Sequence, residues 1–220
     1  MEDNMKKRLL VVDLGYTKDQ SVIGQFPEST ELKVVRTLEE AHEEVRPKYG
    51  FTWEELRAQY TPNHAGGNTQ WWDHFKRTRE KLLQSRLPYW DAVLTDLWEN
   101  ETSQIPVGFG IAMIAVCSGA KYVAIMQRRS RNGSIFHWLP GLGFYDPASL
   151  QIESRKVVLS NDQPYGKGWC EQWGDLLALT VLINELPMDI SYSDLRAKID
   201  EMGGRGPAVN HYWPDLIKPK

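Results

Sequence analysis

Cysteine is scarce in this sequence, with Cys117 and Cys170 as its two copies in 220 residues. Two isolated cysteines build neither a disulfide framework nor a cysteine-rich zinc site, and they indicate a reducing compartment. Excess charge of one sign is also lacking, because the formal net charge is only -3. Without a strong positive field, neither nucleic acid nor an anionic membrane is an expected partner.

No long hydrophobic run opens the chain either. The N-terminal "MEDNMKKRLLVVDLG" holds an apolar stretch too short for a signal sequence or a membrane span, and an acid follows it at once. We therefore expect a cytoplasmic protein. Its 220 residues are enough for one large core. Nine tryptophans, several of them beside charged residues, indicate an interaction surface in addition to that core.

Short apolar runs rich in β-branched residues alternate with helical segments along the chain. Five runs are predicted to be strands, at residues 8–13, 31–37, 91–97, 121–126 and 154–161. Thr37 caps the helix "LEEAHEEVRPK", with Glu40 at the capping-box position, and Gly119 closes the apolar helix "IPVGFGIAMIAVCSGA". A long helix is expected within residues 166–187. Strands that alternate with helices predict a parallel sheet covered on both faces.

Two segments interrupt this alternation. Residues 50–88 insert a helical hairpin, whose apolar face either packs on the domain or forms an arm for a protein partner or self-association. Residues 127–153 hold glycine, proline and aromatics where a helix is expected, and we predict an irregular segment that can form a hairpin into the fifth strand. The predicted organisation is a domain at 1–187, with the insertion at 50–88, and a C-terminal extension at 188–220.

Two acids stand at the ends of predicted strands. Asp13 follows "RLLVV" and Asp96 closes "DAVLTD". In an open parallel sheet, ligands meet the carboxyl ends of the strands near the reversal of strand order, where these two strands are expected. Two carboxylates that share a site repel each other and invite a hard cation with oxygen ligands. Asp13 and Asp96 are therefore candidate ligands of Mg²⁺, and such an ion would neutralise a phosphoryl group that an aspartate attacks.

The segment "DAVLTDL", together with "VVDLG", "TLEEA" and "SGAKYVAIM", resembles the response-regulator receiver domain of the chemotaxis type, over about residues 8–49 and 89–185. The resemblance implies a doubly wound, flavodoxin-like sheet of five parallel strands in the order 2-1-3-4-5, with the helical insertion added. It also implies roles for three acids. Asp91 would open the third strand, Asp96 would be the phosphoacceptor that closes it, and Asp13 would hold magnesium.

Three positions depart from the receiver pattern. Leu14 replaces the second acid of the magnesium-binding pair, Gln127 stands where receivers place a hydroxyl residue, and Gln163 replaces the lysine after the fifth strand. We therefore expect a degenerate, non-enzymatic pseudo-receiver that acts through protein contacts without phosphorylation, with Mg²⁺ as the one candidate cofactor. Two alternatives stay open. One is an active receiver phosphorylated at Asp96 in signal transduction, and the other is an enzyme that binds a metal or phosphate ligand through Asp13 and Asp96.

A basic loop follows the fourth predicted strand. "QRRSRNG" places three arginines, the first of them Arg128, on the same carboxyl-end side as Asp96. Arg128, Gln127 and Gln163 are candidate contacts for a phosphate group, because an arginine fork binds phosphate through two hydrogen bonds. The alternative is a solvated loop whose arginines pair with nearby glutamates and Asp162.

Overall fold

The computed structural model describes residues 7–14, 22, 25–50, 54–55, 73, 76–81, 84, 86–87, 89–99, 105–127, 148–152, 155–161, 173–187 and 190–201. The chain divides into two compact units. The larger unit comprises Met1–Arg46 and Trp90–Lys220, and the smaller unit is Pro47–Tyr89. In the described residues, no helix is both long and apolar enough to span a bilayer.

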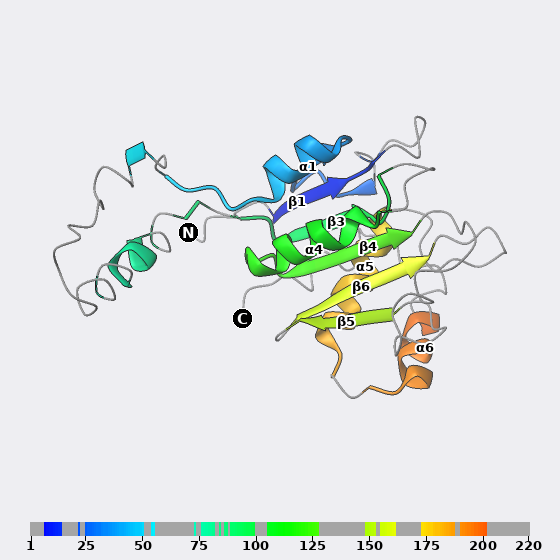
Figure 1. Ribbon diagram of the computed structural model, residues 1–220. Helices are drawn as coiled ribbons and strands as arrows, with labels where there is room; N and C mark the ends of the chain where they lie inside the picture. Colours follow the sequence, from blue (N-terminus) through cyan, green and yellow to red (C-terminus); the bar gives the residue numbers. More distant parts are fainter. Residues whose placement is uncertain are drawn as a thin grey trace. The chain divides into compact units, whose positions relative to one another are not determined.

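A six-stranded sheet forms the centre of the larger unit (Figure 1). Its strands are β1 (Lys7–Val12), β2 (Thr30–Val35), β3 (Ala92–Asp96), β4 (Tyr122–Gln127), β5 (Ala148–Ile152) and β6 (Arg155–Asn161). They lie in the order β2-β1-β3-β4-β6-β5, and every neighbouring pair is parallel except β6 and β5. The chain is therefore an α/β protein with a mostly parallel sheet.

The prediction of five parallel strands in the order 2-1-3-4-5 is wrong in strand count and in order. The predicted runs correspond to β1, β2, β3, β4 and β6, and the additional strand β5 comes from the segment 127–153. β5 pairs antiparallel with β6, which follows it in the chain, and it forms the outer edge of the sheet. The pairing confirms the hairpin predicted from residues 127–153 into the fifth predicted strand, although the sequence did not locate the short strand "ASLQI" within that segment.

Helices cover both faces of the sheet (Figure 1). α1 (Leu38–Val45) and α4 (Val107–Cys117) lie on one face, and α5 (Trp173–Glu185) lies on the other. The last described helix, α6 (Tyr192–Glu201), follows α5 in the chain. Every residue of β3 and β4 is buried, as expected for central strands of a parallel sheet that is covered on both sides.

Local sequence signals set the ends of α1 and α4, and both predicted signals are confirmed. Thr37 Oγ1 accepts a hydrogen bond from Glu40 N at 3.2 Å, and Glu40 Oε2 accepts one from Arg36 N at 3.1 Å. The bond from the Arg36 amide lowers the pKa of the Glu40 carboxyl. Gly119 follows α4 with a φ of 99°, in the left-handed region that favours glycine at the end of a helix.

Lys156 joins β6 to the end of α5. Its buried Nζ donates hydrogen bonds to the carbonyls of Ile183, Leu186 and Pro187 at 2.9, 2.8 and 3.2 Å. The last carbonyls of a helix have no partner within it, so this ammonium group satisfies acceptors that would otherwise be lost. Burial lowers the pKa of Lys156, whereas the three carbonyls favour its charged form.

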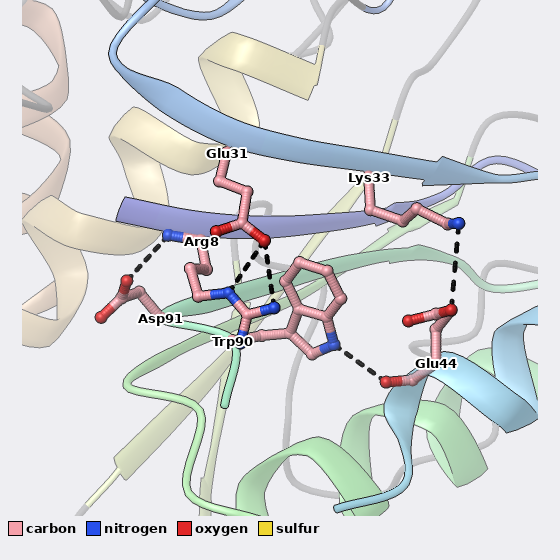
Figure 2. A network of polar contacts seen from close by, with 6 residues as sticks. All are labelled: Arg8, Glu31, Lys33, Glu44, Trp90 and Asp91. Atoms are coloured by element: carbon pink, nitrogen blue, oxygen red, sulfur yellow. Dashed lines mark hydrogen bonds and ion pairs between the residues drawn. The ribbon is translucent and has the colours of Figure 1, made fainter. Parts of the chain in front are cut away.

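A network of polar contacts joins the amino ends of β1, β2 and β3 (Figure 2). Asp91 Oδ2 accepts a hydrogen bond from Arg8 N at 2.8 Å, and the Asp91 carbonyl accepts from two amides at the start of β4 at 3.0 Å. The Arg8 guanidinium lies 4.8 Å from the centroid of the Trp90 ring and pairs with Glu31 at 3.1 Å. The acid that opens β3 thus binds backbone groups on both neighbouring strands.

Trp90 also fixes the place where the chain leaves and re-enters the larger unit. Its Nε1 donates to the Glu44 carbonyl at 2.8 Å, in the last turn of α1 (Figure 2). Within the smaller unit, Tyr49 and Arg86 form an antiparallel bridge, with a backbone hydrogen bond of 3.0 Å beside it. Residues 76–81 are helical, and most of the predicted helical hairpin lies outside the described residues.

We expect the larger unit to fold without residues 50–85. A short Gly/Ser linker in their place retains the bridge of the smaller unit and the hydrogen bond of Trp90, so far-UV circular dichroism should still show a folded α/β protein with a cooperative thermal transition. The control variant lacks residues 45–90, including Val45 and Trp90, which are 0% and 7% exposed, and should unfold. Loss of the sheet signal in the first variant would show that the insertion belongs to the core.

Candidate functional site

Asp13 and Asp96 lie next to each other at the carboxyl edge of the sheet. β1 and β3 are parallel, with Val12 opposite Thr95, so the next residue of each strand is an aspartate. Both aspartates are only 1% exposed. The register therefore brings the two acids together, as the sequence predicts.

Hydrogen bonds tie the backbone together at this edge. Asp96 Oδ2 accepts a hydrogen bond from Leu14 N at 2.7 Å, and Asp13 N donates to the Val35 carbonyl of β2 at 2.9 Å. A carboxylate that accepts from a backbone amide makes a short bond that is stronger than one between neutral groups. Leu14 is 2% exposed. Asp96 is thus bound by the amide of Leu14, at the position where a receiver would carry a second acid.

The two carboxylates stand at the end of an apolar layer. Leu94, two residues before Asp96, belongs to the buried cluster that contains Leu176 of α5. Met126 is paired with Asp96 in the register and belongs to the same cluster. Strand alternation therefore assigns Asp96 to the α5 side of the sheet. Two buried carboxylates beside such a layer are costly to keep ionised unless hydrogen bonds or a cation compensate them.

α4 begins close to the end of β3. Gly108 N donates to the Leu97 carbonyl at 3.0 Å, and a Cβ atom at Gly108 would lie 2.2 Å from the Asp96 carbonyl oxygen. No side chain fits at that distance, so glycine alone permits this approach. Thr95 Oγ1 donates a hydrogen bond to the Asp96 carbonyl at 2.9 Å. Sequence reasoning missed Gly108, although a glycine in the first turn of an apolar helix was the available signal.

Gln127 ends β4 and is 3% exposed. Its neighbour Met126 lies on the Asp96 side of the sheet, so alternation along β4 assigns Gln127 to the opposite face. The other candidate phosphate contacts, Arg128 and Gln163, lie outside the described residues.

Ser160 is a further buried polar residue at this edge, and sequence reasoning missed it. It is paired with Met126 in the register, which places it in the same row as Asp96, two strands away. The residue is 2% exposed, and its Oγ makes no hydrogen bond in the part of the chain that the structure describes. The available signal was a hydroxyl residue in place of the next apolar one in "KVVLSN".

The carboxyl edge of the sheet offers carboxylate oxygens as possible ligands for a cation. Carboxylate oxygens suit a hard cation, and Mg²⁺ often takes one or two carboxylates with water in the rest of its shell. Across the described ranges, no group of three or more His, Cys, Asp and Glu side chains is arranged to hold a metal. Asp13 and Asp96 would therefore hold a cation with water as the main other ligand.

Alanine at Gly108 should displace α4 from the end of β3. The Cβ atom would meet backbone at 2.2 Å, and we expect a loss of about 1–3 kcal/mol in the free energy of unfolding, measured in urea. Gly110 is the matched control, because a Cβ atom there meets nothing within 4 Å. Gly110→Ala should be neutral or stabilising by up to about 1 kcal/mol, since alanine favours helix. Equal effects of the two substitutions would contradict the close approach.

Neither models of protein families, nor curated proteins, nor solved structures give a match to this chain. The functional interpretation of the carboxyl edge therefore depends on the residues that form it. These are the buried pair Asp13 and Asp96, the amide of Leu14 and the contact at Gly108.

Proposed function

We propose that the chain is a receiver-like regulatory module that acts through protein contacts and does not use Asp96 as a phosphoacceptor. The sequence of parallel strands β2-β1-β3-β4-β6 supports a flavodoxin-like arrangement, to which β5 is added at the edge. Acids at the ends of β1 and β3 support the likeness to receivers.

The hydrogen bond between Asp96 Oδ2 and the Leu14 amide carries the proposal. Attack on a phosphoryl group requires a carboxylate oxygen that the phosphodonor can reach, with cations to neutralise the charge that develops. Asp96 is 1% exposed, and one of its oxygens is bound to the Leu14 amide at 2.7 Å. Attack would therefore fall to the other oxygen, Oδ1, which is buried as well, and Leu14 supplies no carboxylate to bind a cation beside it.

The two residues that would stabilise a phosphoaspartate in a receiver are replaced by glutamines, which form weaker hydrogen bonds. Gln127 and Gln163 stand where receivers carry a hydroxyl residue and a lysine. A hydrogen bond to a charged group is worth about 1.5–3 kcal/mol, against about 0.5–1.5 kcal/mol for a neutral one. A phosphoaspartate at Asp96 would lack the ammonium group that offsets its charge in receivers. Phosphorylation would therefore stabilise an altered conformation only weakly.

A regulatory module of this kind needs surfaces for its partners. The smaller unit, Pro47–Tyr89, is compact by itself. The hydrogen bond of Trp90 to Glu44 holds together the two points from which the chain enters it. We assign to this unit a role in binding a protein partner or a second copy of the chain.

Incubation with Mg²⁺ and a small phosphodonor should leave the intact mass of the chain unchanged at every sampled time. The reason is that Asp96 is buried and bound to the Leu14 amide. Asp96→Asn serves as the control for any modification elsewhere on the surface. A gain of one phosphoryl mass in the parent chain that disappears in Asp96→Asn would overturn the proposal in favour of an active receiver.

A second candidate function is a cation site formed by Asp13 and Asp96, in an enzyme or a binding protein. The observation that favours it is the pairing of two carboxylates, each 1% exposed, at the ends of adjacent strands. Like charges in such a place repel each other, and a divalent cation would offset that repulsion. Asp13 and Asp96 would bind the ion, which would supply positive charge for a phosphate group.

The second candidate predicts a saturable change in tryptophan fluorescence as Mg²⁺ is added, because half-buried Trp98 lies two residues after Asp96. Asp13→Asn should weaken binding, since it removes one of the two carboxylates. Trp98→Phe is the matched optical control: the fluorescence change should be lost, while calorimetry still detects binding. A flat titration of the parent chain by both methods eliminates this candidate and leaves the first one standing.

A further inference from the structure

β2 is the end strand of the sheet, and among the described residues it pairs on one side only, with β1. The Val35 carbonyl accepts a hydrogen bond from Asp13 N, after β1, at 2.9 Å. The N–H and C=O groups of one strand residue point to the same side, and successive residues alternate. Lys33 therefore faces β1 with its backbone, whereas Leu32 and Val34 turn their amide and carbonyl groups outward. An edge of this kind can template another strand.

The chain itself closes both ends of this open stretch. Thr30 N donates to the Pro27 carbonyl at 2.9 Å, and Arg36 N donates to Glu40 Oε2 at 3.1 Å. The open edge is thus confined to the segment between Thr30 and Arg36. It has the length of a short extended peptide.

A cleft of about 1010 Å³ lies beside this edge, between β2 and α1, and Val34 and Val35 line it from the strand. Two cations, Lys33 and Arg46, are among its lining residues. Five glutamates line it as well, namely Glu39, Glu40, Glu43, Glu44 and Glu99. The cleft therefore has an excess of negative charge next to unpaired backbone groups.

Part of this negative charge is not compensated within the described structure. Glu44 lies 3.9 Å from Lys33 Nζ (Figure 2), and Glu40 binds the Arg36 amide. The remaining carboxylates make no ion pair with any described residue, and they are Glu39, Glu43 and Glu99. All three are exposed. Charge complementarity thus selects a basic ligand.

We propose that the open edge of β2 and the acidic cleft bind an extended segment of a partner protein, rich in lysine or arginine, which adds to the sheet as a strand. Main-chain hydrogen bonds to Leu32 and Val34 hold the segment, and its basic side chains reach the glutamates. Lys33 projects toward Glu44 on the α1 side of the sheet. Side chains alternate along a strand, so every second residue of the segment faces that side, and those are the basic positions.

Pairing of two copies of this chain through their β2 edges is the less favourable occupancy. It would bring two sets of uncompensated glutamates into one interface, and like charges placed against each other oppose association. The inference rests on the proposed function in one respect, because it names the class of protein partner for that module. It does not depend on the state of Asp96.

The test uses the full chain and a short labelled peptide of alternating lysine and threonine, with binding measured by fluorescence anisotropy. We expect saturable binding that weakens as NaCl rises from about 0.05 to 0.5 M. The double variant Glu39→Gln and Glu43→Gln should raise Kd by about three- to tenfold, because two surface ion pairs are lost. The matched control, Glu185→Gln with Glu201→Gln, removes the same charge from exposed positions of the larger unit that do not line the cleft and should leave Kd unchanged.

Strand addition has its own readout. The same peptide with N-methyl groups on alternate amides keeps its charge but loses donors, and it should bind at least about tenfold more weakly. In the complex, hydrogen exchange at the Leu32 and Val34 amides should slow. Equal binding of the N-methylated peptide with unchanged exchange would reduce the contact to adsorption of a polycation and overturn the inference.

Absence of binding by the parent peptide, or an equal loss in the control variant, would overturn it as well. Phosphorylation is measured at Asp96 and peptide binding at β2, so failure of the peptide test leaves the proposal for Asp96 intact, and the reverse also holds.

Discussion

The hydrogen bond from the Leu14 amide to Asp96 Oδ2 is the interaction on which the carboxyl edge of the sheet depends. It joins the neighbouring strands β1 and β3 at their ends. Next to it, Asp13 N donates a hydrogen bond to the Val35 carbonyl of β2. The Asp96 main-chain carbonyl lies against Gly108 in the first turn of α4. Of these contacts the Asp96 carboxylate makes only the first, and its other oxygen, Oδ1, is also buried.

The opposite end of β3 shows the same use of an acid. Asp91 Oδ2 binds the Arg8 amide, and its carbonyl accepts from the start of β4. The spacing of the two acids in "DAVLTD" is the pattern that carries the resemblance to receivers. In this fold, Asp91 binds the amide of Arg8 in β1, and Asp96 binds the amide of Leu14 just after β1. The two acids of the motif thus bind backbone amides at the two ends of the β1–β3 pair.

Features set by local sequence, or by the parallel direction of two neighbouring strands, could be predicted, whereas the alignment of residues across several strands could not. The cap at Thr37, the glycine at 119 and the placement of Asp13 beside Asp96 follow from signals within a few residues or from the parallel direction of the strands. The row that contains Asp96 and Ser160 depends on how three strands align across more than one crossover, and the sequence does not encode that alignment in any single segment. The hairpin of β5 and β6 was predicted because the two segments are neighbours in the chain, although the residues of β5 could not be located in advance. The need for glycine at position 108 could be recognised only once the position of the Asp96 backbone was known.

The hydrogen bond between Trp90 and the Glu44 carbonyl holds the two ends of the inserted segment together. The stability of the sheet should therefore depend little on the length of that segment. For a loop with fixed ends, each doubling of length costs only about 0.6 kcal/mol in closure entropy. This chain should therefore tolerate large changes of length between α1 and β3 while keeping the same sheet. A foreign domain whose own termini lie close together meets the same condition, so this junction is a natural splice point for a reporter or a second binding domain.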